Sequence, residues 1–181
     1  MRVTNWTSIA AIAVCLSVSA WAGDGDHGNG RFESDVIGSM PGDTVGGVTS
    51  GGAPWVATGH ASASSNGRMH LNITGLLIAA GPGVPANLVG TVGPVTMVAV
   101  SLVCGGSGGW VAASSDGAPL SSAGDAEINT TVAVPASCVA PTVLVRIFRP
   151  AEPVGSQLGP FIALSGFNAG AAAQNDSGHD K

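Results

Sequence analysis

The stretch that comes closest to a catalytic motif is residues 105–109, whose sequence GGSGG fits the pattern G-x-S-x-G. In hydrolases this pattern places a nucleophilic serine on a sharp strand-to-helix turn, and an aspartate and a histidine later in the chain complete the triad. Here the apolar residues 110–114 predict a strand after the glycines, and His179 is the only later histidine. We therefore interpret the segment as a glycine-rich hairpin loop, and a secreted hydrolase using Ser107 is the alternative function.

Histidines are the other side chains suited to acid-base or metal chemistry. His27 and His179 lie in polar segments near the chain ends, which leaves His60 and His70. A zinc site needs at least three protein ligands, and no third ligand stands near this pair, so we expect no metal, no cofactor and no catalytic residue. The polar strand face that carries His60 and His70, flanked by the glycine-rich loop and Trp110, is the candidate binding face. The alternative is a face that is simply solvated.

The first residues have the features of an export signal. Arg2 is the only charge before the apolar run of residues 9–16, and residues 17–22 end in Ala-Trp-Ala before Gly23. The run is too short for a membrane span, which needs about 20 apolar residues. We expect residues 1–22 to be a cleaved signal peptide and the protein to be secreted or periplasmic, with no membrane span after cleavage.

Cleavage would leave two of the three cysteines. Cys15 lies in the predicted signal peptide, so the mature chain keeps Cys104 and Cys138. In an oxidising compartment one disulfide is the default expectation. It would close a loop of roughly 35 residues, for which the chain-entropy model gives about 4 kcal/mol. The alternative is a pair of buried free thiols.

The segments beside the two cysteines both predict strands. Residues 95–103 are rich in β-branched side chains and apolar at both parities, which is typical of a central strand covered on both faces. Residues 143–148 alternate between a fully apolar face and a mixed one. We expect the disulfide to link the ends of these two strands, as neighbours in the core.

Residues 54–77 predict a hairpin whose register follows from its polarity. A two-residue turn at Asn66 and Gly67 would mix polar with apolar side chains across the pair, whereas a three-residue loop of residues 65–67, with Gly67 left-handed, separates them. The inner pairs are then Ala63 with Met69, Ala61 with Leu71 and Gly59 with Ile73; the outer pairs are Ser64 with Arg68, Ser62 with His70 and His60 with Asn72.

Composition supports an all-β fold. Only 9% of the residues are charged, 45% are hydrophobic, and 28 glycines and 11 prolines interrupt the short apolar runs. We predict an antiparallel β-sandwich, Ig-like or jelly-roll-like, with one inter-strand disulfide. Further strands are expected at residues 32–37, 44–49, 110–114, 126–134 and 161–167.

The predicted organisation is one domain between two polar segments. Residues 23–31 and residues 168–181 are small, polar and glycine-containing, so we expect both to be disordered. Residues 32–167 then form a single β-sandwich domain. A net charge of -5 without a basic cluster argues against nucleic acid and anionic membrane surfaces as partners.

Several short motifs occur along the chain in an order that is similar to that of a known family. They are Pro54-Trp55-Val56, Gly59-His60-Ala61, Asn66-Gly67, Gly75-Leu76-Leu77-Ile78, Val103-Cys104-Gly105-Gly106, Gly124-Asp125-Ala126-Glu127-Ile128, Pro135-Ala136-Ser137-Cys138-Val139-Ala140-Pro141 and Phe161-Ile162-Ala163-Leu164-Ser165-Gly166. Over about residues 54–167 the chain resembles an uncharacterised family of small secreted bacterial proteins, with the two cysteine motifs as the most specific part. The resemblance implies a bacterial source and supports the disulfide, and it carries no activity.

These observations favour a non-catalytic exported β-domain. We expect it to act in binding or as a structural component, at the cell surface or in the extracellular space, with a protein or a glycan as its partner.

Overall fold

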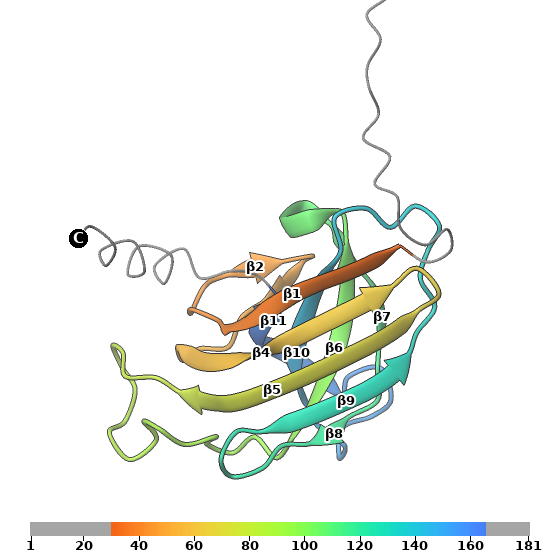
Figure 1. Ribbon diagram of the computed structural model, residues 1–181. Helices are drawn as coiled ribbons and strands as arrows, with labels where there is room; N and C mark the ends of the chain where they lie inside the picture. Colours follow the sequence, from red (N-terminus) through yellow and green to blue (C-terminus); the bar gives the residue numbers. More distant parts are fainter. Residues whose placement is uncertain (1–29, 166–181) are drawn as a thin grey trace, which may run out of the picture.

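The computed structural model describes residues 30–165 (Figure 1). The predicted signal peptide and the predicted tail lie outside these residues. The predicted disordered segment, residues 23–31, overlaps them only at Gly30 and Arg31. Arg31 is the first residue of the first strand.

The described chain is built from strands and one short 3-10 turn. The elements are β1 (Arg31–Gly38), β2 (Thr44–Val45), β3 (Val48–Thr49), β4 (Trp55–Ser64), β5 (Arg68–Ile78), β6 (Met97–Cys104), η1 (Gly106–Gly108), β7 (Trp110–Ser114), β8 (Ala118–Pro119), β9 (Ala126–Thr131), β10 (Thr142–Phe148) and β11 (Leu158–Ser165). The predicted all-β class is confirmed. Over residues 30–165 the structure has no helix long and apolar enough to cross a membrane.

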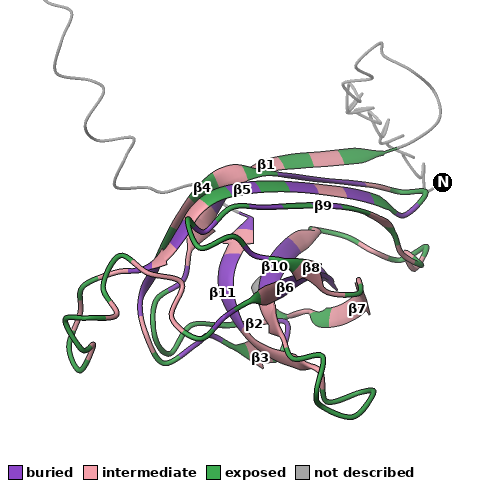
Figure 2. Ribbon diagram, turned by 90° about the horizontal axis from the view of Figure 1, so that it is seen from below, coloured by how far each residue is buried: buried purple, intermediate pink, exposed green. Residues whose placement is uncertain are grey.

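Nine strands form one antiparallel sheet that curls into a half-barrel. The order is β7-β6-β10-β11-β1-β4-β5-β9, and β8 pairs with β6. Figures 1 and 2 show β1, β4, β5 and β9 as one layer, which lies across the layer of β11, β10, β6 and β7. The two layers therefore belong to a single folded sheet, which is compatible with the predicted sandwich but does not confirm it.

β1 joins the two layers. Its residues 31–35 pair with β4, whereas Val36–Gly38 pair with β11. Just beyond it, the Ser39 N–H donates to the Ile162 carbonyl at 3.1 Å, and the Ser39 carbonyl accepts from the Trp55 N–H at 2.9 Å. Gly38 has no room for a side chain, because a Cβ there would lie 1.9 Å from the Trp55 carbonyl oxygen.

The main core fills the space between the layers. One side is lined from β4, β5 and β9 by Ala61, Ala63, Met69, Leu71, Ile73 and Ile128, and the other from β6 and β10 by Val98, Val100, Leu102, Val143 and Val145. Trp55 is only 6% exposed and belongs to the same cluster. Burying each large aliphatic side chain stabilises the fold by about 1.5 to 3 kcal/mol.

β6 is covered on both faces, as its apolar sequence predicts. Every residue from Val98 to Cys104 is buried. A second cluster of Val103, Leu144 and Phe161 lies on the opposite side of the sheet from the main core, under Val45 and Val48 of the β2–β3 hairpin.

The hairpin of β2 and β3 corrects one expectation. Residues 44–49 were predicted to be one strand, yet the chain reverses at Gly46 and Gly47, which have positive φ angles of 59° and 74°. Two left-handed residues in a row are typical of a type I′ turn, which glycine adopts at little cost. A Cβ on Gly46 would lie 2.7 Å from the Val103 methyl carbons, so the turn packs tightly on β6.

The β4–β5 hairpin has the predicted register. Ala63 pairs with Met69, Ala61 with Leu71, Gly59 with Ile73, Ser62 with His70 and His60 with Asn72. Residues 65–67 form the loop, and Gly67 has a φ of 88°. The apolar side chains face the core, so the three-residue loop is confirmed.

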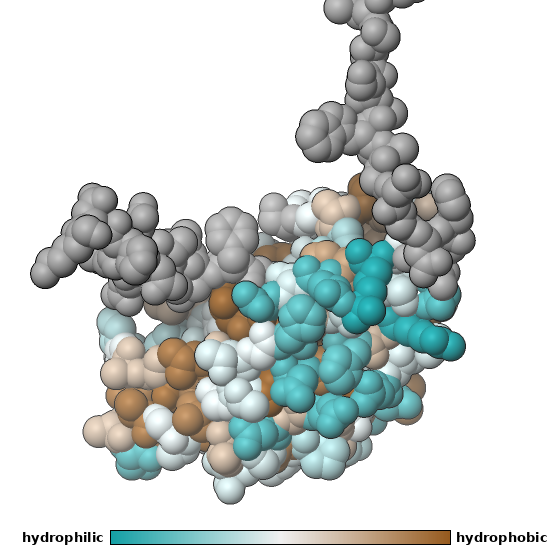
Figure 3. All heavy atoms as spheres, in the orientation of Figure 1, coloured by the Kyte–Doolittle hydropathy of each residue, from teal (hydrophilic) through white to brown (hydrophobic). Residues whose placement is uncertain are grey.

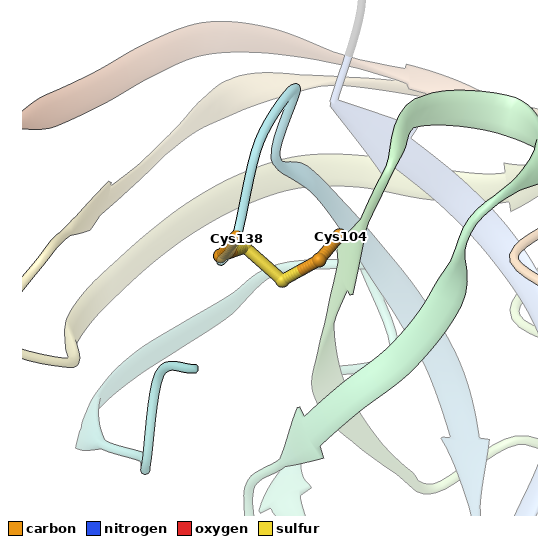
Figure 4. The surroundings of a disulfide bond; sticks show 2 residues. All are labelled: Cys104 and Cys138. Carbon is orange, nitrogen blue, oxygen red and sulfur yellow. A yellow bond between two sulfur atoms is a disulfide. The ribbon is translucent and has the colours of Figure 1, made fainter. Parts of the chain in front are cut away.

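The predicted disulfide joins Cys104 and Cys138, whose Cα atoms lie 4.9 Å apart (Figure 4). Cys104 is the last residue of β6, which pairs with β10 in the core. Cys138 belongs to the loop between β9 and β10, so the bond joins the end of β6 to a loop and not, as expected, to the end of the neighbouring strand. Beside it, the Gly105 N–H donates to the Val139 carbonyl at 2.6 Å and the Gly106 N–H to the Ala140 carbonyl at 3.1 Å.

We expect Cys104→Ala/Cys138→Ala to lower the free energy of unfolding by about 2 to 5 kcal/mol, because the open chain gains entropy when unfolded. Urea unfolding of the purified protein measures this, and reductant should bring the wild type to the stability of the double variant. Equal stability of the oxidised wild type and the double variant would contradict the expected contribution of the bond.

Candidate functional site

Polar side chains gather on the outer face of β1, β4, β5 and β9. We call it the polar face; it consists of Arg31, Glu33, Asp35, Thr58, His60, Ser62, Ser64, Arg68, His70, Asn72, Thr74, Glu127, Asn129 and Thr131. Figure 3 shows hydrophilic residues gathered over these strands. It includes the face predicted around His60 and His70.

Strand register arranges the polar face in rows. Each of these strands alternates polar outer residues with residues that face the core, and antiparallel pairing places the polar ones opposite one another. One row runs Glu33, Ser62, His70, Asn129, and the next runs Asp35, His60, Asn72, Glu127.

His70 begins a hydrogen-bonded chain. Its Nδ1 lies 2.7 Å from Asn129 Oδ1, and Asn129 Nδ2 donates to Glu127 Oε1 at 2.9 Å. Because the carboxylate only accepts, the Asn129 amide nitrogen faces Glu127 and its oxygen faces His70. His70 must then carry its proton on Nδ1 when the ring is neutral.

The other charged contacts on the polar face are exposed. His60 Nδ1 lies 3.9 Å from Asp35 Oδ1, with side chains 47% and 80% exposed. Arg31 forms an ion pair with Glu33 on the same strand. Exposed ion pairs contribute about 0 to 1 kcal/mol and exchange readily with solvent.

His60 and His70 lie on neighbouring strands in adjacent rows, as the hairpin register requires. Within residues 30–165 no three His, Cys, Asp or Glu side chains are grouped to hold a metal ion. Asp35, Glu127 and Asn129 were not foreseen as neighbours of the histidines. The alternation of residues 126–131 predicted a strand, but nothing local indicates which strand it pairs with.

Arg146 is the one described group whose pKa departs clearly from its ordinary value. Burial on β10 lowers the pKa of its guanidinium. Its Nε donates to the Gly159 carbonyl at 2.8 Å and its Nη2 to the Leu158 carbonyl at 3.0 Å. These bonds hold β10 against β11, so the role of Arg146 is structural.

Trp110 belongs to another part of the sheet. It is 50% exposed on β7, and β6, β10, β11 and β1 lie between β7 and β4 in the strand order. The preceding segment is confirmed as a hairpin loop, since η1 connects the paired strands β6 and β7. The Ser107 side chain lies outside the described part of the structure.

Two hollows adjoin the polar face. The larger, about 770 Å³, lies at its β4–β5 hairpin end and includes Arg31, Arg68 and His70 in its lining. A smaller recess of about 440 Å³ lies between the layers and is more apolar, with Phe32, Leu102 and Cys138 in its lining.

No protein-family model, curated protein or solved structure matches this chain. The resemblance to secreted bacterial proteins therefore stays a prediction.

We predict that neutral His70 carries its proton on Nδ1, although free imidazole side chains favour Nε2. Nitrogen-15 NMR of the neutral ring measures the tautomer. Asn129→Ala should restore the Nε2–H form at His70 and leave His60 unchanged. An Nε2–H tautomer at His70 in the wild type would contradict the hydrogen-bonded chain.

Proposed function

We propose that this chain is a non-catalytic exported β-domain that binds a protein or a glycan at the cell surface or in the extracellular space. The polar face is the binding surface. The observation that carries the proposal is the set of unbroken polar rows across four neighbouring strands.

The chemistry of the polar face suits recognition. Hydroxyl, amide, carboxylate, imidazole and guanidinium groups stand side by side, and most are exposed. Their backbones are fixed by the sheet, whose inner face packs on the core. A rigid support of this kind reduces the entropy lost on binding. Loops and outer faces can also vary in sequence without loss of the core.

Export is the second part of the proposal. The Cys104–Cys138 disulfide fits an oxidising compartment. The Ala-Trp-Ala sequence at residues 20–22, after a short apolar run, supports signal cleavage before Gly23. The resemblance to secreted bacterial proteins favours the same location.

We predict that the full chain, expressed in a bacterium, is recovered outside the cytoplasm. Its intact mass should be that of a chain that begins at Gly23. This protein should bind a component of a cell-surface, glycan or secreted-protein array. Asn72 is exposed near the middle of the polar face. Asn72→Leu should weaken binding about tenfold, because the apolar side chain cannot make the hydrogen bonds of the amide and adds no charge.

Ser156→Leu is the matched control. It adds the same side chain in the exposed β10–β11 loop, away from the polar face, and should leave binding unchanged. Binding that Asn72→Leu leaves intact would contradict the assigned surface. Hydrolase turnover that disappears in Ser107→Ala, or that requires an added metal ion, would overturn the non-catalytic function.

A further inference from the structure

We infer that the β4–β5 hairpin end of the polar face binds the anionic groups of an acidic glycan, through Arg31 and Arg68. This inference rests on the proposed function, because it names the ligand class for the same surface. The feature behind it is the 770 Å³ hollow and the distribution of charge around it.

Arginines are few and two of them share this hollow. The whole chain has six Lys and Arg residues, and its net charge is -5. Arg31 pairs across β1 and β4 with Ser64, and the Ser64 hydroxyl donates to the Arg68 carbonyl at 3.2 Å. Arg31 and Arg68 therefore flank Ser64 on the strands at either side. Their backbones are about 10 Å apart at two strand spacings, so both side chains can reach one ligand.

The arginines and the acidic side chains occupy different rows of the polar face. The hollow is lined by Arg31, Arg68 and His70 together with Ser62, Ala63, Ser64, Asn66, Met69, Asn129, Thr130 and Thr131, and no carboxylate is among these residues. The acids Glu33, Asp35 and Glu127 lie one or two rows further along. An anion is thus attracted to the hairpin end and repelled from the next rows.

The arginines are available to a ligand. Arg68 is exposed, and the side chain of Arg31 is 65% exposed. The ion pair of Arg31 with Glu33 is a surface pair, which a better-placed anion can replace. A guanidinium offers two parallel N–H donors that match the two oxygens of a carboxylate or sulfate.

The remaining lining favours a sugar as the carrier of the anion. Serine and threonine hydroxyls and the Asn66 and Asn129 amides can both donate to and accept from sugar hydroxyls. On the polar face, as described, the only rings are the two imidazoles, so a neutral sugar has no broad aromatic platform for stacking. Recognition must then depend on the charged group, which a uronate or a sulfated sugar supplies.

The test measures binding of the disulfide-bonded mature protein to immobilised polygalacturonate, heparin and neutral dextran. Binding to at least one acidic polymer is expected, with little or none to dextran; the two acidic polymers distinguish carboxylate from sulfate. Arg68→Gln should weaken binding about tenfold, the value of one charge-assisted hydrogen-bond pair. Arg149→Gln removes the same charge from an exposed position beyond β10 and should have no effect.

Further readouts separate recognition from net charge. Arg68→Lys keeps the charge but loses the paired donors, so its affinity should fall between those of the wild type and Arg68→Gln. Equal effects of Arg68→Gln and Arg149→Gln, or equal binding to dextran, would overturn the inference. Binding of a protein or neutral glycan that Asn72→Leu weakens and Arg68→Gln leaves intact would also overturn it, while the proposed function stands. An enzymatic turnover as defined above would overturn the proposed function itself.

Discussion

The backbone of Ser39 is bonded to both layers of the molecule at once. Its N–H donates to Ile162 in β11 and its carbonyl accepts from Trp55 in β4. The preceding Gly38 approaches the Trp55 backbone at a distance that no side chain permits. One strand can therefore leave one layer and enter the other without a loop, and the sheet closes over its own core. The polar face depends on this junction, because β1 supplies one side of it.

The other layer is stabilised from both sides. β6 and β10 have the main core on one face and the β2–β3 hairpin on the other. The disulfide then fixes the β9–β10 loop to the end of β6. These contacts concentrate burial on β6, β10 and β11. Within residues 30–165 no element covers the outer face of β1, β4, β5 and β9. A rigid sheet with one solvated polar face is the physical basis of the proposed function.

Local rules account for the parts of the fold that the sequence predicts correctly. The β4–β5 register follows from period-two polarity and from a glycine at the left-handed loop position, both of which lie within residues 55–78. The central position of β6 follows from the apolar side chains on both of its faces. The reversal at Gly46 and Gly47 was missed because six residues are too few to show alternation.

Local sequence rules could not predict which distant segments pair as strands. Nothing near residues 126–131 indicates that they pair with β5, and so the contact of Asn129 with His70 was not foreseen. The same holds for the separation of Trp110 from the histidines, which depends on the order of all the strands between them. Strand partners are chosen by tertiary packing of the whole core rather than by local sequence. The disulfide is the exception, since residues 30–165 contain only two cysteines.

The most direct test of the junction at β1 compares the free energies of unfolding of Gly38→Ala and Gly52→Ala with that of the wild type. A Cβ at position 38 would meet the Trp55 backbone, whereas one at position 52 has no heavy atom within 4 Å. We expect Gly38→Ala to lower the free energy of unfolding by at least about 2 kcal/mol, which is more than most single substitutions cost. Gly52→Ala should stay close to the wild type. A Gly38→Ala protein as stable as the wild type would contradict the junction at β1 as the constraint on which the fold depends.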